Sequence, residues 1–422
     1  MRRFIRIMAR TSKNFSSLAD NSYETWSKED LIQRIQSLES TKPKSPAKSN
    51  PDKKGKKVFD FSKISTRFIA LRFAYMGWNF NGLSFQYDPT PLPTVEEVIL
   101  DAMVKAKLIE SSDPSSCGFS RCGRTDKGVS ALNQVIALNV RSNLDIKDQA
   151  DISKDDRELP YVTILNALLP LDIRITEVCL RPPEGFDARF SCLYRHYKYV
   201  FSGEHLDVAA MKVAAKLYEG THDFRNFCKI DGSKQITNHE RLIHSADIIS
   251  VNEKFYAFDL KGSAFLWHQV RCMVAILFLV GQGHEKPSIV SDLLNVEKYP
   301  SRPLYEMAHD IPLVLYDCVF PEMEWLSPAT NFGESQQIKM QKECKRFNGL
   351  KLDYQLKAQI VSMMDQVFAK KLPSQKSNYV NLGDGVGRAF KNYTPLSQRP
   401  LGETVEHQNL KFLEKKKRKL EK

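Results

Sequence analysis

The stretch Gly118–Gln134, GFSRCGRTDKGVSALNQ, decides how we interpret the rest of the chain. It places three glycines and three basic residues around a single carboxylate, that of Asp126. The basic residues are Arg121, Arg124 and Lys127. Glycine allows tight turns and the close approach of a ligand, and nearby cations favour the ionised form of a carboxylate. We therefore expect a rigid loop that presents one anionic group to an electrophilic centre on a polyanion.

The residues alone leave two other interpretations of this loop open. A glycine-rich charged loop is most often only a turn. The spacing of Gly118, Gly123, Arg124 and Thr125 also fits the phosphate-loop pattern GxxxxG[K/R][ST]. That pattern normally has lysine in place of Arg124, a buried strand before the loop and a helix after it. The preceding SSDPSSC does not resemble a buried strand, and the following DKG is a poor helix start, so nucleotide hydrolysis is disfavoured.

The composition indicates an intracellular protein with a polyanionic partner. The 422 residues carry a formal net charge of +12, and the sequence pI is about 9.1. Such a protein most simply binds nucleic acid, although many basic proteins are merely soluble. The eight cysteines include no CxxC pair and no matching histidine cluster, so we expect reduced thiols and no metal site.

Three segments precede the expected folded core. Residues 1–25 are a basic arm, and the first 19 of them hold five basic residues and no acid, as in a mitochondrial presequence or an RNA-binding arm. Residues 26–40 predict a short helix with Ser27 as its N-cap. Residues 41–64 are a lysine- and proline-rich linker that we expect to be disordered, and its charge could also serve nuclear import. No apolar run approaches the roughly 20 residues of a membrane span.

Residues 65–320 predict an α+β core in two halves, 65–185 and 186–320. Apolar residues alternate in RFIALRFAY, which begins at Arg67 and indicates a strand. Thr94 and Glu97 form a capping box at the start of a helix. Further strands are expected at 134–140, 173–180, 194–201, 242–251, 254–261 and 313–319, and further helices at 161–169, from Asp207 to Gly220, and at 266–280. Strands interleaved with helices suggest a sheet with helices on one face and an open face for RNA.

Residues 321–422 are expected to form a C-terminal extension. A helical pattern recurs from Lys351 to Lys371. The last segment, Lys411–Lys422, carries seven basic residues against two acids and predicts a disordered or helical basic tail.

Four motifs, in order, resemble those of the TruA family of tRNA pseudouridine synthases. They are CGRTDKGVSA followed by QVIALNV, then ARFSCLYRHYKYVF at 188–201, GSAFLWHQVRCMVAILFLVGQG at 262–283 and IPLVLYDCVF at 311–320. NALLPLDIRI at 166–175 is similar to another stretch of the family. GTHDFRNFCKID at 220–231 and NYTPLSQRPLGETVE at 392–406 resemble the eukaryotic branch that acts at positions 38 and 39 of the anticodon arm.

The resemblance implies a fold and a reaction. The fold would be two ferredoxin-like or RRM-like half-domains that form one continuous, mainly antiparallel sheet with helices on one face and a central RNA-binding cleft. The reaction would convert uridine to pseudouridine in the anticodon arm of tRNA, with no cofactor and no metal. The family also implies a homodimer, and we expect no membrane association. We expect the protein in the nucleus and cytoplasm, with mitochondrial targeting by residues 1–19 as an alternative.

The resemblance also implies roles for individual residues. Asp126 would be the catalytic nucleophile or electrostatic stabiliser, and Arg271, the one charge in its apolar helix, would pair with it. Tyr197 would be the active-site tyrosine that stacks on the base, and Leu315 would line the uracil pocket or simply belong to the core.

Arg124 would fill the stack vacated by a flipped base, with Arg121 and Lys127 as further RNA contacts. His268 is expected to pack or to contact RNA.

A non-catalytic RNA-binding module is the competing class. Such a module needs a basic surface and aromatic side chains, but it needs neither Asp126 nor a lone arginine in an apolar helix. Mapping pseudouridine in tRNA with and without the protein separates the two classes.

Overall fold

The computed structural model describes residue 27 and residues 59–328, 333–369 and 378–420. Residues 60–422 form one compact unit. The expected basic arm at 1–25, the expected helix at 26–40 except Ser27, and residues 41–58 of the expected linker lie outside the described residues. Within the last part of the linker, which we expected to be disordered, Phe61–Lys63 form a 3-10 helix capped by Asp60.

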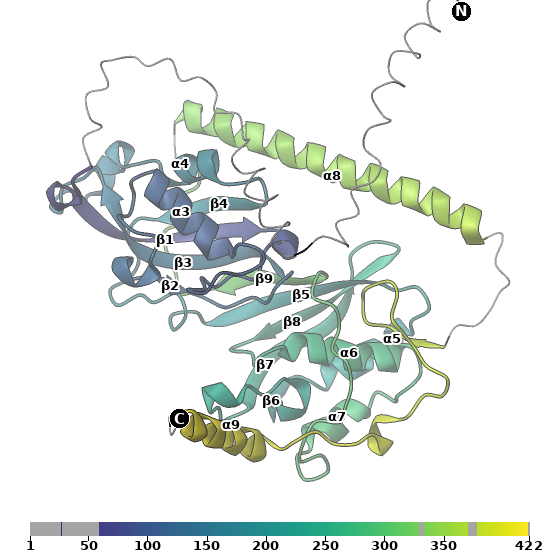
Figure 1. Cartoon of the computed structure of the whole chain (residues 1–422). Helices are drawn as coiled ribbons and strands as arrows, with labels where there is room; N and C mark the ends of the chain where they lie inside the picture. The colour runs from purple at the N-terminus through teal and green to yellow at the C-terminus, as the bar shows by residue number, and fades with distance from the viewer. Residues whose placement is uncertain (1–26, 28–58, 329–332, 370–377, 421–422) are drawn as a thin grey trace, which may run out of the picture. The chain divides into compact units, whose positions relative to one another are not determined.

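In the described chain, one nine-stranded sheet carries the core (Figure 1). The strand order is β4-β1-β3-β9-β5-β8-β7-β6, and the short strand β2 also pairs with β3. The strands are β1 (Ser65–Tyr75), β2 (Ser120–Arg121), β3 (Ser130–Ser142), β4 (Ile173–Cys179), β5 (Tyr194–Ser202), β6 (Gly220–Asp223), β7 (Glu240–Ser250), β8 (Phe255–Gly262) and β9 (Leu313–Val319). The mixed α+β class and the mainly antiparallel sheet are therefore confirmed.

Strand β9 joins the two parts of this sheet. It is parallel to β3, with Ala131 opposite Leu315, and antiparallel to β5, with Tyr197 opposite Leu315. The other ladders, including β1 with β3 and β5 with β8, are antiparallel. The register therefore places β9, which carries Leu315, between the start of β3 and the strand β5 that carries Tyr197.

The core helices form where capping residues and apolar spacing predict them. They are α3 (Val95–Lys105), α4 (Tyr161–Leu168), α5 (Val208–Lys216), α6 (Gln269–Gly281) and α7 (Ile289–Leu294). The Thr94–Glu97 capping box is present at α3, and the Asp207 carboxylate caps α5 by accepting a hydrogen bond from the Ala210 amide. Helix α4 packs on β4, and α5 packs on β7 and α6 (Figure 1). Every residue of α6 is buried, which explains why its sequence is apolar apart from Gln269 and Arg271.

The C-terminal extension contains two helices and a small hairpin. Helix α8 (Glu334–Ala369) begins well before the expected helical stretch and buries none of its residues. The Arg174–Glu343 ion pair, at 2.8 Å, attaches it to β4. Strands β10 (Tyr379–Val380) and β11 (Arg388–Ala389) pair with each other, and the basic tail is helical as α9 (Val405–Leu420). Among the described residues, none of the helices combines the length and the apolar character of a membrane span.

Candidate active site

The loop that carries Asp126 is fixed on both sides of this residue. The hydroxyl of Thr125 shares a 2.6 Å hydrogen bond with that of Tyr75 at the end of β1. The Thr125 carbonyl accepts from the Leu83 amide at 3.2 Å, and the Asp126 carbonyl accepts from the Val129 amide at 3.2 Å. The loop continues directly into strand β3, whereas a phosphate loop requires a helix there. The geometry therefore agrees with a rigid loop that presents the Asp126 carboxylate and not with a nucleotide-binding loop.

Two glycines hold the loop against its neighbours. Gly128 has φ +82°, and a Cβ at this position would lie 3.0 Å from the Asp310 carboxylate. Gly82 has φ +85°, and a Cβ there would lie 2.9 Å from the Thr125 carbonyl oxygen. Both the backbone conformation and the space exclude a larger residue. The loop is thus pressed between the segment after β1 and the segment before β9.

The Asp126 carboxylate faces His268. Its Oδ2 lies 3.2 Å from His268 Nε2, and the Asp126 side chain is 31% exposed while that of His268 is 10% exposed. The carboxylate is therefore reachable from solvent on one side and held by an imidazole on the other. This arrangement leaves Oδ1 as the more available oxygen for a reacting group.

The surroundings of His268 favour one proton position. His268 precedes α6 in a left-handed conformation with φ +61°, and its ring stacks on Trp267 with centroids 4.4 Å apart. Its Nδ1 is buried, and within the described residues it has no hydrogen-bond partner. A buried N–H without an acceptor costs about 1–3 kcal/mol. A proton at Nε2, which lies 3.2 Å from Asp126 Oδ2, avoids this cost, so this tautomer fits the site.

The expected ion pair between Asp126 and Arg271 does not form in this structure. Arg271 Nε donates to the Ala308 carbonyl at 2.7 Å, and its Nη2 lies 3.9 Å from Asp310 Oδ2. The physical reason is that the segment before β9 lies against the guanidinium and supplies both acceptors. Arg271 therefore reaches the Asp126 loop indirectly, because Asp310 also packs against Gly128.

Tyr197 and Leu315 lie opposite each other on β5 and β9, where the two parts of the sheet join. Tyr197 is 9% exposed, and its ring makes an edge contact with Phe265 at 5.0 Å between centroids. Burial raises the pKa of Tyr197, so the phenol is neutral at physiological pH. Leu315 is fully buried between its neighbours. Leu315 thus lies in the core beside the start of β3, and Tyr197 lies on the strand at the other side of β9.

The three basic residues of the loop divide into two kinds. Arg121 pairs with Glu96 of α3, a fully buried residue, and its guanidinium lies 5.2 Å from the Phe119 ring centroid. Burial raises the pKa of Glu96, and the Arg121 cation opposes that rise. Arg124 and Lys127 are exposed and make no ion pair with any described residue. Arg124 and Lys127 are therefore free to meet a polyanion, while Arg121 ties the loop to α3.

Sequence reasoning missed His268 as the direct neighbour of Asp126, and it missed Asp310. A signal for His268 was present in its place in the sequence, three residues before Arg271 and directly before α6. No local signal marks Asp310, because its contact with Gly128 depends on the parallel pairing of β9 with β3.

Known proteins with similar sequences act on tRNA according to their names. A family model described as tRNA pseudouridine synthase matches residues 214–321. The chain is 52% identical to "tRNA pseudouridine(38/39) synthase" of Saccharomyces cerevisiae, over 96% of this chain and 94% of that protein. It is 43% identical to the Homo sapiens protein of the same name, over 70% of this chain and 66% of that protein. It is 33% identical to "tRNA pseudouridine synthase A" of Methanococcoides burtonii, over 61% of this chain and 85% of that protein.

Proposed function

We propose a substrate and a mechanism for this chain, which belongs to the TruA family of tRNA pseudouridine synthases. It is an isomerase that converts uridine to pseudouridine in tRNA. The target nucleotides are positions 38 and 39 of the anticodon arm, as the names of its relatives in yeast and human support. The observation that carries the mechanism is the partly exposed Asp126 carboxylate on a rigid loop, 3.2 Å from His268.

In the reaction, the N1–C1′ glycosidic bond breaks, the uracil turns, and C5 bonds to C1′ with loss of the C5 proton to N1 or solvent. Asp126 attacks the sugar or the base, or stabilises the charge that develops when the glycosidic bond breaks. Its fixed loop supplies the positioning that a single-carboxylate mechanism needs. No electron or phosphoryl group is transferred, so the proposed reaction requires no cofactor and no metal.

The target base must leave the RNA stack to reach Asp126, at a cost of a few kcal/mol. Exposed Arg124, two residues before Asp126, fills the vacated position. Tyr197 forms the wall against which the uracil rests, with the buried Leu315 opposite it on β9, and the Tyr197 ring contributes stacking of about 1–3 kcal/mol. Lys127 adds unpaired positive charge at the same loop, and Arg121, though paired with Glu96, lies beside it; both favour a phosphate-rich ligand.

The fold and assembly complete the proposal. The strands β4, β1 and β3 and the strands β5, β8, β7 and β6 would form two half-domains of ferredoxin-like type, at 65–185 and 186–320, with the RNA cleft between them. The chain would act as a homodimer in the nucleus and cytoplasm, and residues 1–19 would direct a fraction to mitochondria. Light scattering at micromolar concentration tests the dimer, and a reporter fused to residues 1–19 tests the targeting.

The experiment that tests the function uses purified protein, unmodified tRNA and EDTA. We expect pseudouridine to form at positions 38 and 39 and nowhere else in the tRNA. A strict requirement for a metal or nucleotide, or tRNA binding with no pseudouridine, would contradict the proposal.

A further inference from the structure

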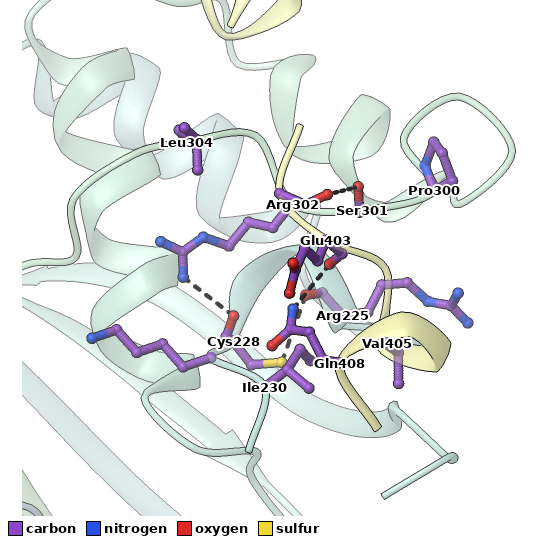
Figure 2. Close-up of a pocket in the computed structure, with 12 residues that line it drawn as sticks. Arg225, Cys228, Ile230, Pro300, Ser301, Arg302, Leu304, Glu403, Val405 and Gln408 are labelled. Atoms are coloured by element: carbon purple, nitrogen blue, oxygen red, sulfur yellow. Dashed lines mark hydrogen bonds between the residues drawn. The ribbon is translucent and has the colours of Figure 1, made fainter. Parts of the chain in front are cut away.

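A second site candidate lies beside the second half of the sheet. It is a cavity of about 290 Å³ bounded by three segments, 225–230 after β6, 300–304 after α7, and 402–408 at the start of α9 (Figure 2). The C-terminal extension therefore supplies one wall, and the core supplies the other two. None of the lining residues belongs to the catalytic constellation around Asp126.

The C-terminal wall is fixed to the core by hydrogen bonds. The Ser301 hydroxyl donates to the Gly402 carbonyl at 2.8 Å, and the Gly402 amide donates to the Arg302 carbonyl at 2.9 Å. Pro303 and Leu401 form an antiparallel bridge in the same place. The cavity is thus a built feature of the chain and not a gap beside a loose tail.

The cavity carries positive charge that no carboxylate balances. Figure 2 shows the Arg302 side chain extending to the Cys228 carbonyl, which accepts a 3.2 Å hydrogen bond from Nη1. Arg302 also donates to the Tyr305 carbonyl at 2.7 Å and lies over the Tyr305 ring at 4.4 Å. Among the described residues, neither Arg302 nor Lys229 forms an ion pair, whereas the one lining carboxylate, that of Glu403, is paired with Lys411 at 2.8 Å.

The cysteine in the lining adds no negative charge. Burial raises the pKa of Cys228 to about 12, so its side chain is a neutral thiol at physiological pH. The third lining cation, Arg225, is paired with Asp223 at 2.8 Å. Two cations, Arg302 and Lys229, are left without a counter-charge. Arg302 Nη1 and Nη2 each donate to a carbonyl, so Nε and the second Nη2 hydrogen are the donors that Arg302 offers to a phosphate group. The ligand that suits this cavity is therefore an anion with several oxygen acceptors.

The cavity adjoins the end of α6 that carries the catalytic neighbours. The Lys229 amide donates to the Trp267 carbonyl at 3.0 Å, and Trp267 directly precedes His268. On the other wall, Arg302 Nη1 lies 3.6 Å from Cys272 Sγ, one residue after Arg271. An anion held between Lys229 and Arg302 would thus lie next to the first turn of α6, the helix that His268 precedes.

We infer that this cavity binds a backbone phosphate of the RNA close to the target nucleotide, with Lys229 and Arg302 as its ligands. The inference rests on the proposed tRNA substrate and deepens it. It gives the C-terminal segment 402–408 a role, because this segment forms one wall of the phosphate site.

The test combines a lysine variant with single neutral linkages in the RNA. Anticodon stem-loops that each carry one methylphosphonate are bound to wild type and to Lys229→Gln over a range of salt. For Lys229→Gln we expect the slope of log affinity against log salt to be shallower by about 0.7–0.9, because the variant neutralises one phosphate fewer. We expect one methylphosphonate position to weaken RNA binding by wild type but not by Lys229→Gln. In a double-mutant cycle, this lack of additivity shows that Lys229 contacts that phosphate.

The control is Lys212→Gln, which removes an exposed lysine of α5 that lines no part of the cavity. Lys212→Gln should keep the wild-type slope. Lys229→Arg keeps the positive charge, so its slope should lie closer to the wild-type value than to that of Lys229→Gln. A wild-type slope in Lys229→Gln, or an equal change in Lys212→Gln, would overturn the phosphate site. Pseudouridine is measured in the same wild-type samples, so failure of the proposed function is recognised separately by its absence.

Discussion

The carboxylate of Asp126 is the group on which the proposed chemistry depends. Asp126→Asn keeps the shape of the side chain and removes its charge, so we expect single-turnover conversion to fall to background while tRNA affinity is kept. A rapid-quench assay at saturating tRNA and a binding titration measure the two effects. Asp156→Asn, at an exposed carboxylate remote in sequence, is the control and should react like wild type. A variant Asp126→Asn that still turns over would remove Asp126 from the mechanism.

His268 is the residue that positions Asp126 in this structure. His268→Ala removes the 3.2 Å contact, so the carboxylate is no longer held in its orientation, and we expect the single-turnover rate to fall about 10²-fold with tRNA binding retained. His268→Gln keeps an N–H donor of similar reach and should recover part of the rate.

Arg271→Ala is the informative comparison for His268. It releases the Ala308 and Asp310 contacts but leaves the imidazole in place. If Arg271→Ala slows the reaction and His268→Ala does not, then Arg271 becomes the partner of Asp126 when RNA is bound, and the contact with His268 has no catalytic role.

The sequence pointed to Asp126 because a lone carboxylate among cations and glycines is unusual in a short loop. It could not rank His268 above Arg271, since the two residues are only three positions apart and both lie near the start of α6. Their ranking depends on Ala308 and Asp310, which approach Arg271 from a different segment. Contacts of this kind are tertiary, and no local pattern encodes them.

At the scale of elements, a buried ion pair joins β1 to the segment before α4. Arg67 and Glu158 are 3.1 Å apart with side chains 3% and 2% exposed. Glu158→Gln leaves the Arg67 cation buried without its partner, so we expect a loss of about 3–5 kcal/mol in the free energy of unfolding. Chemical denaturation at pH 7 measures this loss.

The same pair predicts a dependence of stability on pH. Burial acts to raise the pKa of Glu158, but hydrogen bonds from Ser142, Leu159 and Asn143 and the Arg67 cation outweigh it, so the pKa is lowered from its ordinary value of 4.5. A lowered folded-state pKa means that the stabilisation is present above pH 4.5 and is lost as the pH falls through the folded value. The stability difference between wild type and Glu158→Gln should therefore shrink below pH 4.5. A difference that stays constant down to about pH 3 would exclude this origin.

The catalytic loop offers a matched pair of glycine variants. Gly128→Ala places a Cβ at φ +82° and 3.0 Å from the Asp310 carboxylate, so we expect a loss of about 1–3 kcal/mol in stability and a slower reaction. Gly123→Ala is the control, because nothing lies within 4 Å of its added Cβ. Thermal melting and single-turnover rates of both variants test the prediction. Equal behaviour of the two variants would show that the loop is not held as described.

Elements with local signals could be predicted, and elements fixed by distant contacts could not. The capping box of Thr94 and Glu97 marked the start of α3, and the apolar run after Arg271 marked α6. The extent of α8 was underestimated, because its first half is polar and its apolar residues follow no single stripe. The parallel pairing of β9 with β3 had no signal in either strand, since it depends on which edges remain open after the rest of the sheet has formed.

The positive charge of the whole chain should make its affinity for tRNA depend on salt concentration. Helix α9 is exposed along its last residues, and these include Lys415, Lys416, Lys417 and Lys419. Replacing these four lysines with glutamine leaves the buried side of the helix, with Asn409, untouched. We expect tRNA affinity to fall and the salt slope to become shallower by about 0.7–0.9 for each phosphate that the tail no longer neutralises. An unchanged slope would mean that the tail does not contact RNA.

The position of β9 also has a consequence for how the protein is made. β9 (Leu313–Val319) lies between β3 and β5 although the ribosome synthesises it after both. Until it arrives, β3 and β5 each expose an unpaired edge where the two parts of the sheet join, and such edges attract other strands. A chain that stops before residue 313 should therefore aggregate or require a chaperone. Asp310 packs against Gly128 of the catalytic loop, and the start of β9 pairs with the strand that follows this loop. A nascent chain therefore reaches its active geometry only after β9 has been synthesised. Unfinished chains on the ribosome should not modify tRNA.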